Sequence, residues 1–157
     1  AYFSSLPSKL SDLHGKINKM HRALAETAMQ RHGLHLGQDH LLALLWERDG
    51  RTPGEIAAAL QVTAPTVVKM ATRMASGGLL TRRREDKDNR LVRIWLTERG
   101  RALRQPVEAE RESIETSITA GLTPLELEQL LSALGKVQRS ASALLEQTPG
   151  RERGDQA

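Results

Sequence analysis

Cationic side chains recur in two adjoining stretches of this 157-residue chain, and their spacing fits the recognition of phosphates and bases. In the first stretch, Lys69 and Arg73 lie four residues apart, which places them on one face of a helix. The second, residues 82–93, is a run of arginines and one lysine broken by an acidic segment. Ammonium and guanidinium groups bind phosphate oxygens, and arginine also pairs with base edges. These residue types indicate a nucleic acid as the partner.

A helix is predicted to present the first pair of cations. Apolar side chains recur there at i, i+3, i+4 and i+7, the pattern of one buried helix face; they are Val67, Met70, Ala71 and Met74. The opposite face carries Thr66, Lys69 and Arg73. Such a face suits the major groove, where amides and hydroxyls meet phosphates and side chains reach base edges.

A shorter helix is predicted directly before it. Thr52, Pro53 and Glu55 supply a capping hydroxyl, a proline at the first helical position and a glutamate at the third. This helix should run to about Leu60, with its apolar side chains inward. Across the turn at residues 61–63, the two helices form a helix-turn-helix.

Two strands are predicted after the second helix. Residues 79–84 and 91–96 alternate in polarity with period two, and the polar segment from Glu85 to Arg90 between them has the length of a hairpin loop. A basic hairpin directly after a recognition-type helix is the wing of a winged helix. A solvated charge run is the alternative, but its position after such a helix favours DNA.

The segment VTAPTVVKMATRMASGGLLTRRREDKDNRLVRIWLTERG resembles the MarR family of bacterial transcriptional regulators. The resemblance is dense from Leu36 to Leu103 and ends in the Leu-Thr-x-x-Gly that opens the next helix. It implies an Asp-x-Arg in the wing, with Arg90 entering the minor groove and Asp88 holding it. Asn89 stands where this family often has an arginine.

The resemblance and the pattern together predict a mainly α fold. Its order is four helices, a two-stranded wing, and two helices. The residues expected at DNA are Thr63, Ala64, Pro65, Thr66, Lys69, Arg73, Arg82, Arg83, Arg84, Lys87, Asp88, Arg90 and Arg93. Among these, we expect Arg82, Arg83, Arg84, Lys87 and Arg93 to contact phosphates.

Charge and composition support this reading. The net charge is +4, but residues 63–104 hold eleven Lys and Arg against four Asp and Glu, a net of +7, which leaves −3 for the rest. That asymmetry is typical of nucleic-acid binders. There is no cysteine, which excludes disulfides and thiolate chemistry. No apolar run reaches a membrane span and no signal peptide is evident, so we expect a cytoplasmic protein with no membrane partner.

Leucine-rich helices are predicted on both sides of the winged helix-turn-helix. Leu6, Leu10, Leu13, Ile17, Met20 and Leu24 form a coiled-coil type seam that should end near Gly33. Residues 36–47 read as a central core helix, and Thr97 should cap a long helix kinked at Pro106. After a capping formula at Thr123, a second apolar stripe runs to Leu145. We expect a single domain (1–157), dimerisation helices at 6–32 and 104–147, the winged helix-turn-helix at 36–103 and a disordered tail at 148–157.

The five histidines all lie in the first forty residues. No carboxylate joins them at ligand spacing, so we predict no metal and no cofactor. By resemblance, a small aromatic or phenolic effector would bind between the winged helix and the dimer helices. The candidate lining residues are His14, His35, His40 and Trp46, although a tryptophan in so apolar a run is more often a core residue.

These parts predict a homodimeric, sequence-specific regulator of double-stranded DNA, a repressor by resemblance, which would act on a pseudo-palindromic operator. An enzyme is disfavoured, because the sequence has no cysteine nucleophile, no phosphate-binding glycine loop and no histidine-carboxylate cluster. The alternative is a protein-interaction module, since the leucine stripes could pair with a different chain.

Overall fold

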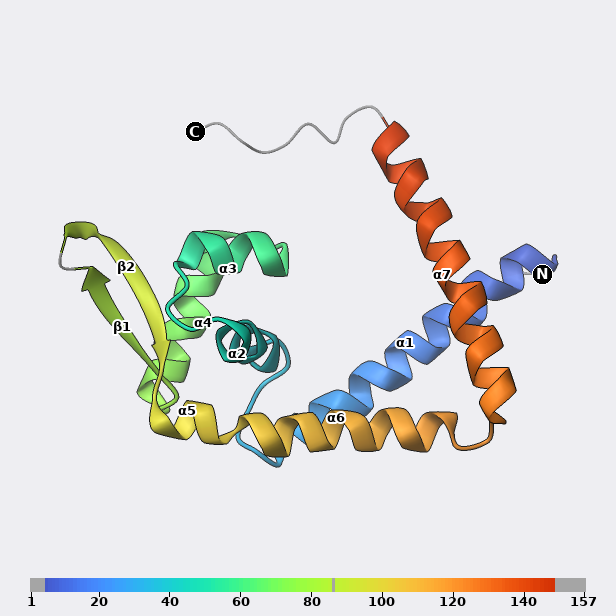
Figure 1. Ribbon diagram of the computed structural model, residues 1–157, viewed down its shortest axis with the longest axis horizontal. Coiled ribbons are helices and arrows are strands. Elements are labelled where there is room, and N and C mark those ends of the chain that lie inside the picture. Colours follow the sequence, from blue (N-terminus) through green and yellow to red (C-terminus); the bar gives the residue numbers. More distant parts are fainter. Residues whose placement is uncertain (1–4, 86, 149–157) are drawn as a thin grey trace. The chain divides into compact units, whose positions relative to one another are not determined.

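The computed structural model, drawn in Figure 1, describes residues 5–85 and 87–148. These residues form two compact units, divided between Ile114 and Glu115. The order of elements is that of a winged helix flanked by long helices. The elements are α1 (Leu6–Gln30), α2 (Gln38–Glu47), α3 (Pro53–Leu60), α4 (Ala64–Ser76), β1 (Leu80–Glu85), β2 (Asp88–Leu96), α5 (Glu98–Ala102), α6 (Arg104–Thr119) and α7 (Pro124–Gln147). The predicted fold class, mainly helical with a two-stranded wing, is confirmed.

The core of the first unit lies under the helix-turn-helix. The α2 residues Leu41, Leu42 and Leu45 are buried there, as the apolar pattern of that helix predicts. They pack in one cluster with residues from both helices of the motif, namely Ile56, Ala57, Val67, Ala71 and Met74. Leu60 and Met70 are partly buried against the same cluster. The predicted buried faces of α3 and α4 are therefore confirmed.

The connection between α1 and α2 is longer than the sequence predicts. α1 ends at Gln30 rather than near Gly33, and α2 begins at Gln38 rather than Leu36. Two glycines with positive φ explain the difference: Gly33 has a φ of 72° and Gly37 one of 98°, values that other residues rarely adopt. Gly37 is the residue that precedes the first turn of α2.

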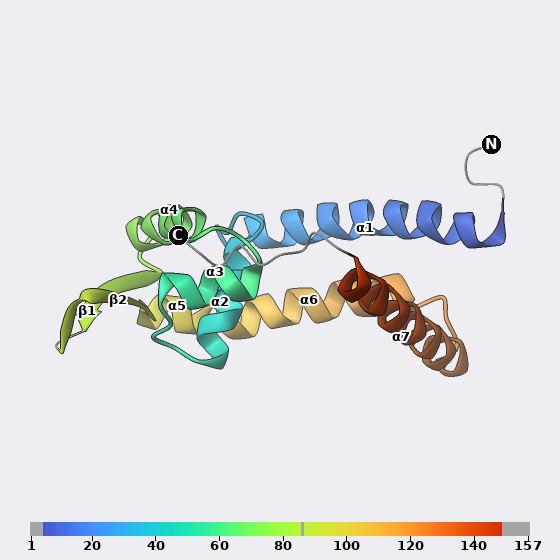
Figure 2. The same ribbon diagram turned by 90° about the horizontal axis from the view of Figure 1, so that it is seen from above.

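The wing is an antiparallel hairpin with a shorter loop than predicted. Leu80 pairs with Leu96 at its base and Arg84 with Val92 further out, and a register irregularity between Arg84 and Glu85 brings Glu85 opposite Asp88. β2 therefore begins three residues earlier than expected. The alternation in β2 is confirmed at Ile94 and Leu96, which are buried. In the view from above, the hairpin extends beyond α4 and α5 (Figure 2).

The helix predicted after the wing is two helices. Thr97 caps α5 as expected, with its hydroxyl accepting from the Gly100 amide at 3.1 Å. The chain then breaks at Leu103, three residues before Pro106, rather than kinking at the proline. Pro106 has no amide to donate to the Ala102 carbonyl, and its ring would clash with that carbonyl. The proline thus falls in the first turn of α6, where the missing donor is tolerated.

The second unit contains α7 with a complete capping box at its start. Thr123 and Glu126 each accept from the other's backbone amide, at 3.1 Å and 3.0 Å. The Thr123 amide first, and its hydroxyl second, hold the pKa of the exposed Glu126 carboxyl below its usual value. This cap was predicted from the sequence. The expected tail lies, from residue 149 on, outside the described residues.

Both predicted leucine stripes are exposed, each within its own unit. On α1, Leu13 is 58% and Met20 64% exposed, and the other seam residues are also exposed. On α7, whose residues are all described, none is buried, and Leu131 is 61% exposed. Single exposed apolar residues are ordinary, but rows of them mark interaction surfaces. No described helix is long and apolar enough to cross a membrane.

Gly100 should not tolerate a side chain. A Cβ there would collide with the backbone carbonyl of Leu79 and press on Leu96. We predict that Gly100→Ala lowers the free energy of unfolding by about 1–3 kcal/mol, the usual cost of overpacking. Urea denaturation measures this, with Gly121→Ala as the control because a Cβ at Gly121 meets nothing within 4 Å. Equal midpoints for the two variants would contradict the prediction.

Candidate nucleic-acid interface

α4 begins with a cap built from two threonines. The Thr63 hydroxyl accepts from the Thr66 amide at 3.4 Å and lies 2.9 Å from the Thr66 hydroxyl. Pro65 occupies the first turn, where a missing amide is tolerated. The outward face carries Lys69 and Arg73, both exposed as predicted. The first turn also leaves backbone amides without helical partners, which suits a phosphate.

The turn between α3 and α4 lies where it was predicted, at residues 61–63, but the backbone conformation of its first residue was not predicted. Gln61 adopts the left-handed conformation with a φ of 57°, and its amide closes α3. The Val62 amide then donates to the Ala57 carbonyl at 3.1 Å. Glycine or asparagine usually signals such a cap, so glutamine gave no cue. This turn orients the recognition helix against α3.

The wing cations fall on two faces of the hairpin. Arg82 stands opposite Ile94 and Arg84 opposite Val92, whereas Arg83 stands opposite Arg93. Because side chains alternate along a strand, Arg82 and Arg84 share one face and Arg83 and Arg93 the other. The five predicted phosphate contacts therefore do not form one continuous row.

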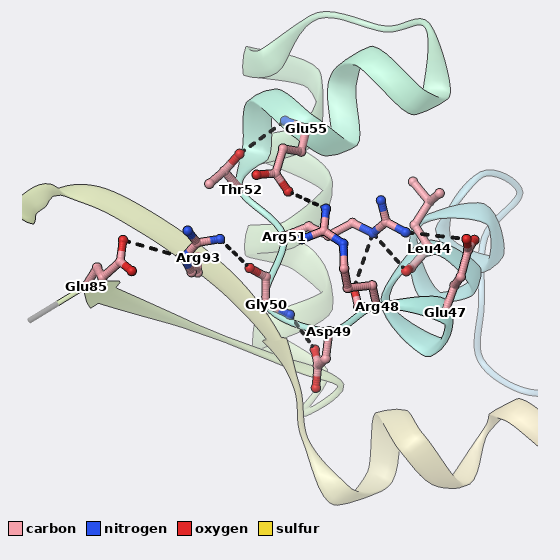
Figure 3. A network of polar contacts seen from close by, with 10 residues as sticks. All are labelled: Leu44, Glu47, Arg48, Asp49, Gly50, Arg51, Thr52, Glu55, Glu85 and Arg93. Carbon is pink, nitrogen blue, oxygen red and sulfur yellow. Dashed lines mark hydrogen bonds and ion pairs between the residues drawn. The ribbon is translucent and has the colours of Figure 1, made fainter.

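Arg93 is engaged within the chain. Its Nη1 donates to the Gly50 carbonyl at 3.0 Å and its Nε lies 3.6 Å from a Glu85 carboxylate oxygen (Figure 3). The neighbouring Arg83 stacks its guanidinium 4.7 Å from the centre of the Trp95 ring. Two of the expected phosphate contacts thus also have structural partners. The bond from Arg93 to Gly50 holds the wing to the segment before α3, whereas the contact of Arg83 with Trp95 lies within the hairpin.

The segment between α2 and α3 joins the wing to the helices. The Ile94 amide donates to the Arg51 carbonyl at 2.9 Å, and the Leu96 amide to a carboxylate oxygen of Asp49 at 2.9 Å. The Arg51 guanidinium reaches back to the Leu44 carbonyl at 3.0 Å (Figure 3). These contacts were not predicted from the sequence, because residues 48–52 show no periodic pattern.

The wing tip is described only in part. Lys87 lies in the turn and Arg90 in β2, and both are exposed. The side chain of Asp88, which was expected to hold Arg90, lies outside the described part of the chain, as does that of Asn89. The exposure of Arg90 suits the expected role in the minor groove.

The four candidate effector residues are not brought together. His40 lines a hollow of about 370 Å³ between α1, α2 and α6. Trp46 borders a different hollow beside α6 and donates its indole N–H to the Gly100 carbonyl at 2.9 Å. His35 lies beside Lys69 and Arg73 of α4, and His14 is exposed on α1.

A group of charged contacts between the end of α1, the start of α2 and α6 was also not predicted from the sequence. Glu110 of α6 accepts from Arg31 at 3.2 Å and lies 3.1 Å from the Nε2 of His32. The next residue, Arg111, donates to Asp39, which is fully buried and also accepts from the Gly37 amide at 3.1 Å. Among the described residues, no three histidine or carboxylate side chains gather as a metal site.

The model of the MarR family matches residues 34–92, which include the core helix, the helix-turn-helix and most of the wing. This segment of the chain is therefore similar to the MarR family. A crystal structure of a MarR family transcription regulator superposes with a TM-score of 0.80 at 23% identity, covering 91% of this chain and 94% of that one. The fold is therefore that of MarR family transcription regulators.

Other relatives are similar over part or most of the chain. The organic hydroperoxide resistance transcriptional regulator of Bacillus subtilis is 39% identical over 64 residues, 41% of this chain and 44% of the relative. The uncharacterised HTH-type regulator YdgJ of Bacillus subtilis is 23% identical over 108 residues, 69% of this chain and 66% of that relative. MepR of Staphylococcus aureus, crystallised with DNA, has a TM-score of 0.71 at 28% identity, covering 83% of this chain and 96% of that one.

Arg93 should act on the wing rather than on the salt dependence of binding. We predict that Arg93→Ala speeds hydrogen exchange at the Ile94 and Leu96 amides, because the wing loses its bond to Gly50. The slope of log affinity against log salt should stay unchanged, since a lost phosphate contact would lower it by about 0.9.

Arg82→Ala is the matched control, because Arg82 is exposed on the opposite face of the hairpin. It should leave amide exchange unchanged and lower the salt slope. If Arg93→Ala instead lowers the slope and leaves the wing amides protected, Arg93 is a phosphate ligand.

Proposed function

We propose that this chain is a homodimeric, sequence-specific DNA-binding transcriptional regulator that represses from a pseudo-palindromic operator. The observation that carries the proposal is an exposed, capped recognition helix beside an arginine-rich hairpin within a segment similar to the MarR family. The DNA complex of MepR supports it, because that protein shares the fold over 83% of this chain.

Recognition would divide between α4 and the wing. Thr63, Ala64, Pro65 and Thr66 would sit at base edges and the nearest phosphates, and Lys69 and Arg73 would reach bases or backbone along the same groove. Arg90 would enter the flanking minor groove, where the potential is most negative, held there by Asp88. Arg82, Arg84 and Lys87 would supply phosphate contacts, and Arg83 and Arg93 would hold the wing.

The uncovered leucine rows are the argument for a dimer. α1 and α7 each expose an apolar row along most of their length, more than a soluble monomer usually leaves in water. The same rows on a second copy would bury them, and a two-fold axis is the usual symmetry of such pairing. Two recognition helices would then reach major grooves about one turn, or roughly 34 Å, apart.

An effector site is proposed at the hollow that contains His40. Its walls include two arginines and two histidines, and one of the arginines, Arg111, is also bonded to the buried Asp39; the lining residues are Asn18, His21, Arg22, Ala25, Leu36, Gly37, His40 and Arg111. Such walls suit a small aromatic anion, in keeping with the resemblance. An effector acts only if it binds one arrangement of the helices better than the other.

The alternative function, a protein-interaction module, predicts a different result in one experiment. Selection of bound duplexes from random-sequence DNA should return a motif with two-fold symmetry if the chain is a sequence-specific dimer. An interaction module would return no motif.

Arg90 and Lys87 should differ in what they contribute to binding. We predict that Arg90→Ala weakens operator binding by about 1–3 kcal/mol and flattens the sequence preference next to each half-site, because Arg90 reads minor-groove shape. Lys87→Ala should weaken all sequences alike and lower the salt slope by about one. Fluorescence anisotropy over a salt series measures both. Unchanged affinity in Arg90→Ala would exclude the wing from the interface.

Dimerisation should depend on the α7 stripe. We predict that Leu131→Glu, which places a charge in the exposed apolar row, shifts the chain to monomer at micromolar concentration and abolishes operator binding. Ser132→Glu is the control, because Ser132 lies about 100° around the helix from Leu131, on the side that faces away from Leu127, Leu130 and Leu134. Sedimentation velocity gives the oligomeric state. A wild-type monomer, or a dimeric Leu131→Glu variant, would contradict the role of this row.

A further inference from the structure

Two exposed methyl-bearing side chains lie one turn apart on α4. Val68 is 40% exposed although it sits in the middle of the helix, and Thr72 follows it at i+4 and is also exposed. Side chains four apart are neighbours on a helix, with Cβ atoms about 5–6 Å apart. Neither residue belongs to the cationic row or to the buried face.

The hydroxyl of Thr72 is already used. It donates to the carbonyl of Val68, in the preceding turn of the helix, at 2.8 Å. A threonine bonded in this way turns its polar group to the helix backbone, so the methyl group is what it offers to a partner. Val68 and Thr72 together therefore present methyl groups only. One exposed valine would be unremarkable, but the bonded threonine beside it makes an apolar row.

This row runs alongside the cations. Lys69 and Arg73 are also four residues apart, and each follows its methyl-bearing neighbour by one residue, or 100° around the helix. The outward face of α4 thus has one apolar row and one cationic row, side by side. Cations can bind phosphates or guanine, whereas the one hydroxyl beside the methyl groups already donates its proton to the Val68 carbonyl and cannot donate it to a phosphate as well.

We propose that Val68 and Thr72 read the C5 methyl group of thymine in the major groove, and so set a preference for thymine at defined operator positions. The inference rests on the proposed DNA-binding function and deepens it. Thymine is the only DNA base of the standard four that displays a methyl group in this groove, and apolar side chains contact it there. Val68 and Thr72 lie on the same exposed surface of α4 that is proposed to face the major groove. We therefore expect these two side chains to contact a base edge.

The test replaces thymine by deoxyuridine, which removes only that methyl group. The operator motif is first selected from random DNA, and each thymine in one half-site is then replaced in turn. For the wild-type dimer we expect one or two positions where deoxyuridine weakens binding about fourfold, the value for burying one methylene-sized group. Val68→Ala should weaken binding to the thymine operator and show little further loss with deoxyuridine at a coupled position.

Paired variants of Thr72 separate the methyl group from the hydroxyl. Thr72→Val keeps the methyl group and should keep both affinity and the sensitivity to deoxyuridine. Thr72→Ser keeps the hydroxyl and should lose about as much as the deoxyuridine substitution does. The opposite result, with serine tolerated and valine not, would show that the hydroxyl makes the contact and would overturn the proposal.

Val62→Ala is the matched control, since Val62 is 39% exposed but lies in the turn before α4. It should show no coupling to the positions that couple to Val68. A selected motif with no thymine sensitive to deoxyuridine overturns this inference and leaves the proposed function intact. Selection of no motif by the wild-type chain overturns both. Circular dichroism confirms that each variant is folded.

Discussion

The position of the wing depends on the backbone hydrogen bond between Ile94 and Arg51. A two-stranded hairpin alone is marginally stable in water, because it needs packing against a helix or further strands. Here Arg51 forms an isolated antiparallel bridge with Ile94 of β2, and the Asp49 carboxylate accepts from the Leu96 amide. The arginines of the hairpin can therefore be held at a defined angle to α4.

Close backbone approach at two glycines makes this arrangement possible. Gly50 has a φ of 71° and lies under the Trp95 ring, so that a Cβ would come within 2.5 Å of it. Gly100 lies against the Leu79 carbonyl at the base of the wing. Gly100 lies in α5, just after the hairpin, and Gly50 lies in the segment between α2 and α3 that contacts β2. The sequence motif Leu-Thr-x-x-Gly thus has a steric reason, since only glycine fits where α5 meets β1.

The features predicted from the sequence are those with short-range causes. Thr52, Thr63, Thr97 and Thr123 each cap a helix within three residues of themselves, and the buried faces of α3 and α4 follow from periodicity. The ion pair between Asp39 and Arg111 joins residues 72 positions apart in the sequence, and the hydrogen bond from Arg93 to Gly50 joins residues 43 positions apart. Those pairings depend on how the helices pack, which periodicity does not determine. The helix was predicted to kink at Pro106 but breaks at Leu103, because a proline disturbs the carbonyl four residues before it.

The two long-range contacts are connected by α2. Asp39, at the beginning of α2, is fully buried and paired with Arg111 of α6. The Leu44 carbonyl, near the end of α2, accepts from Arg51 of the segment that contacts the wing. The Asp39 carboxylate is taken out of water, so its bond to Arg111 offsets the cost of burying that charge and joins α2 to this part of α6. A helix of ten residues transmits displacement with little bending, since its own hydrogen bonds stiffen it. Arg111 also lines the hollow proposed above as an effector site, so a ligand bound there would contact a residue that is itself bonded to α2.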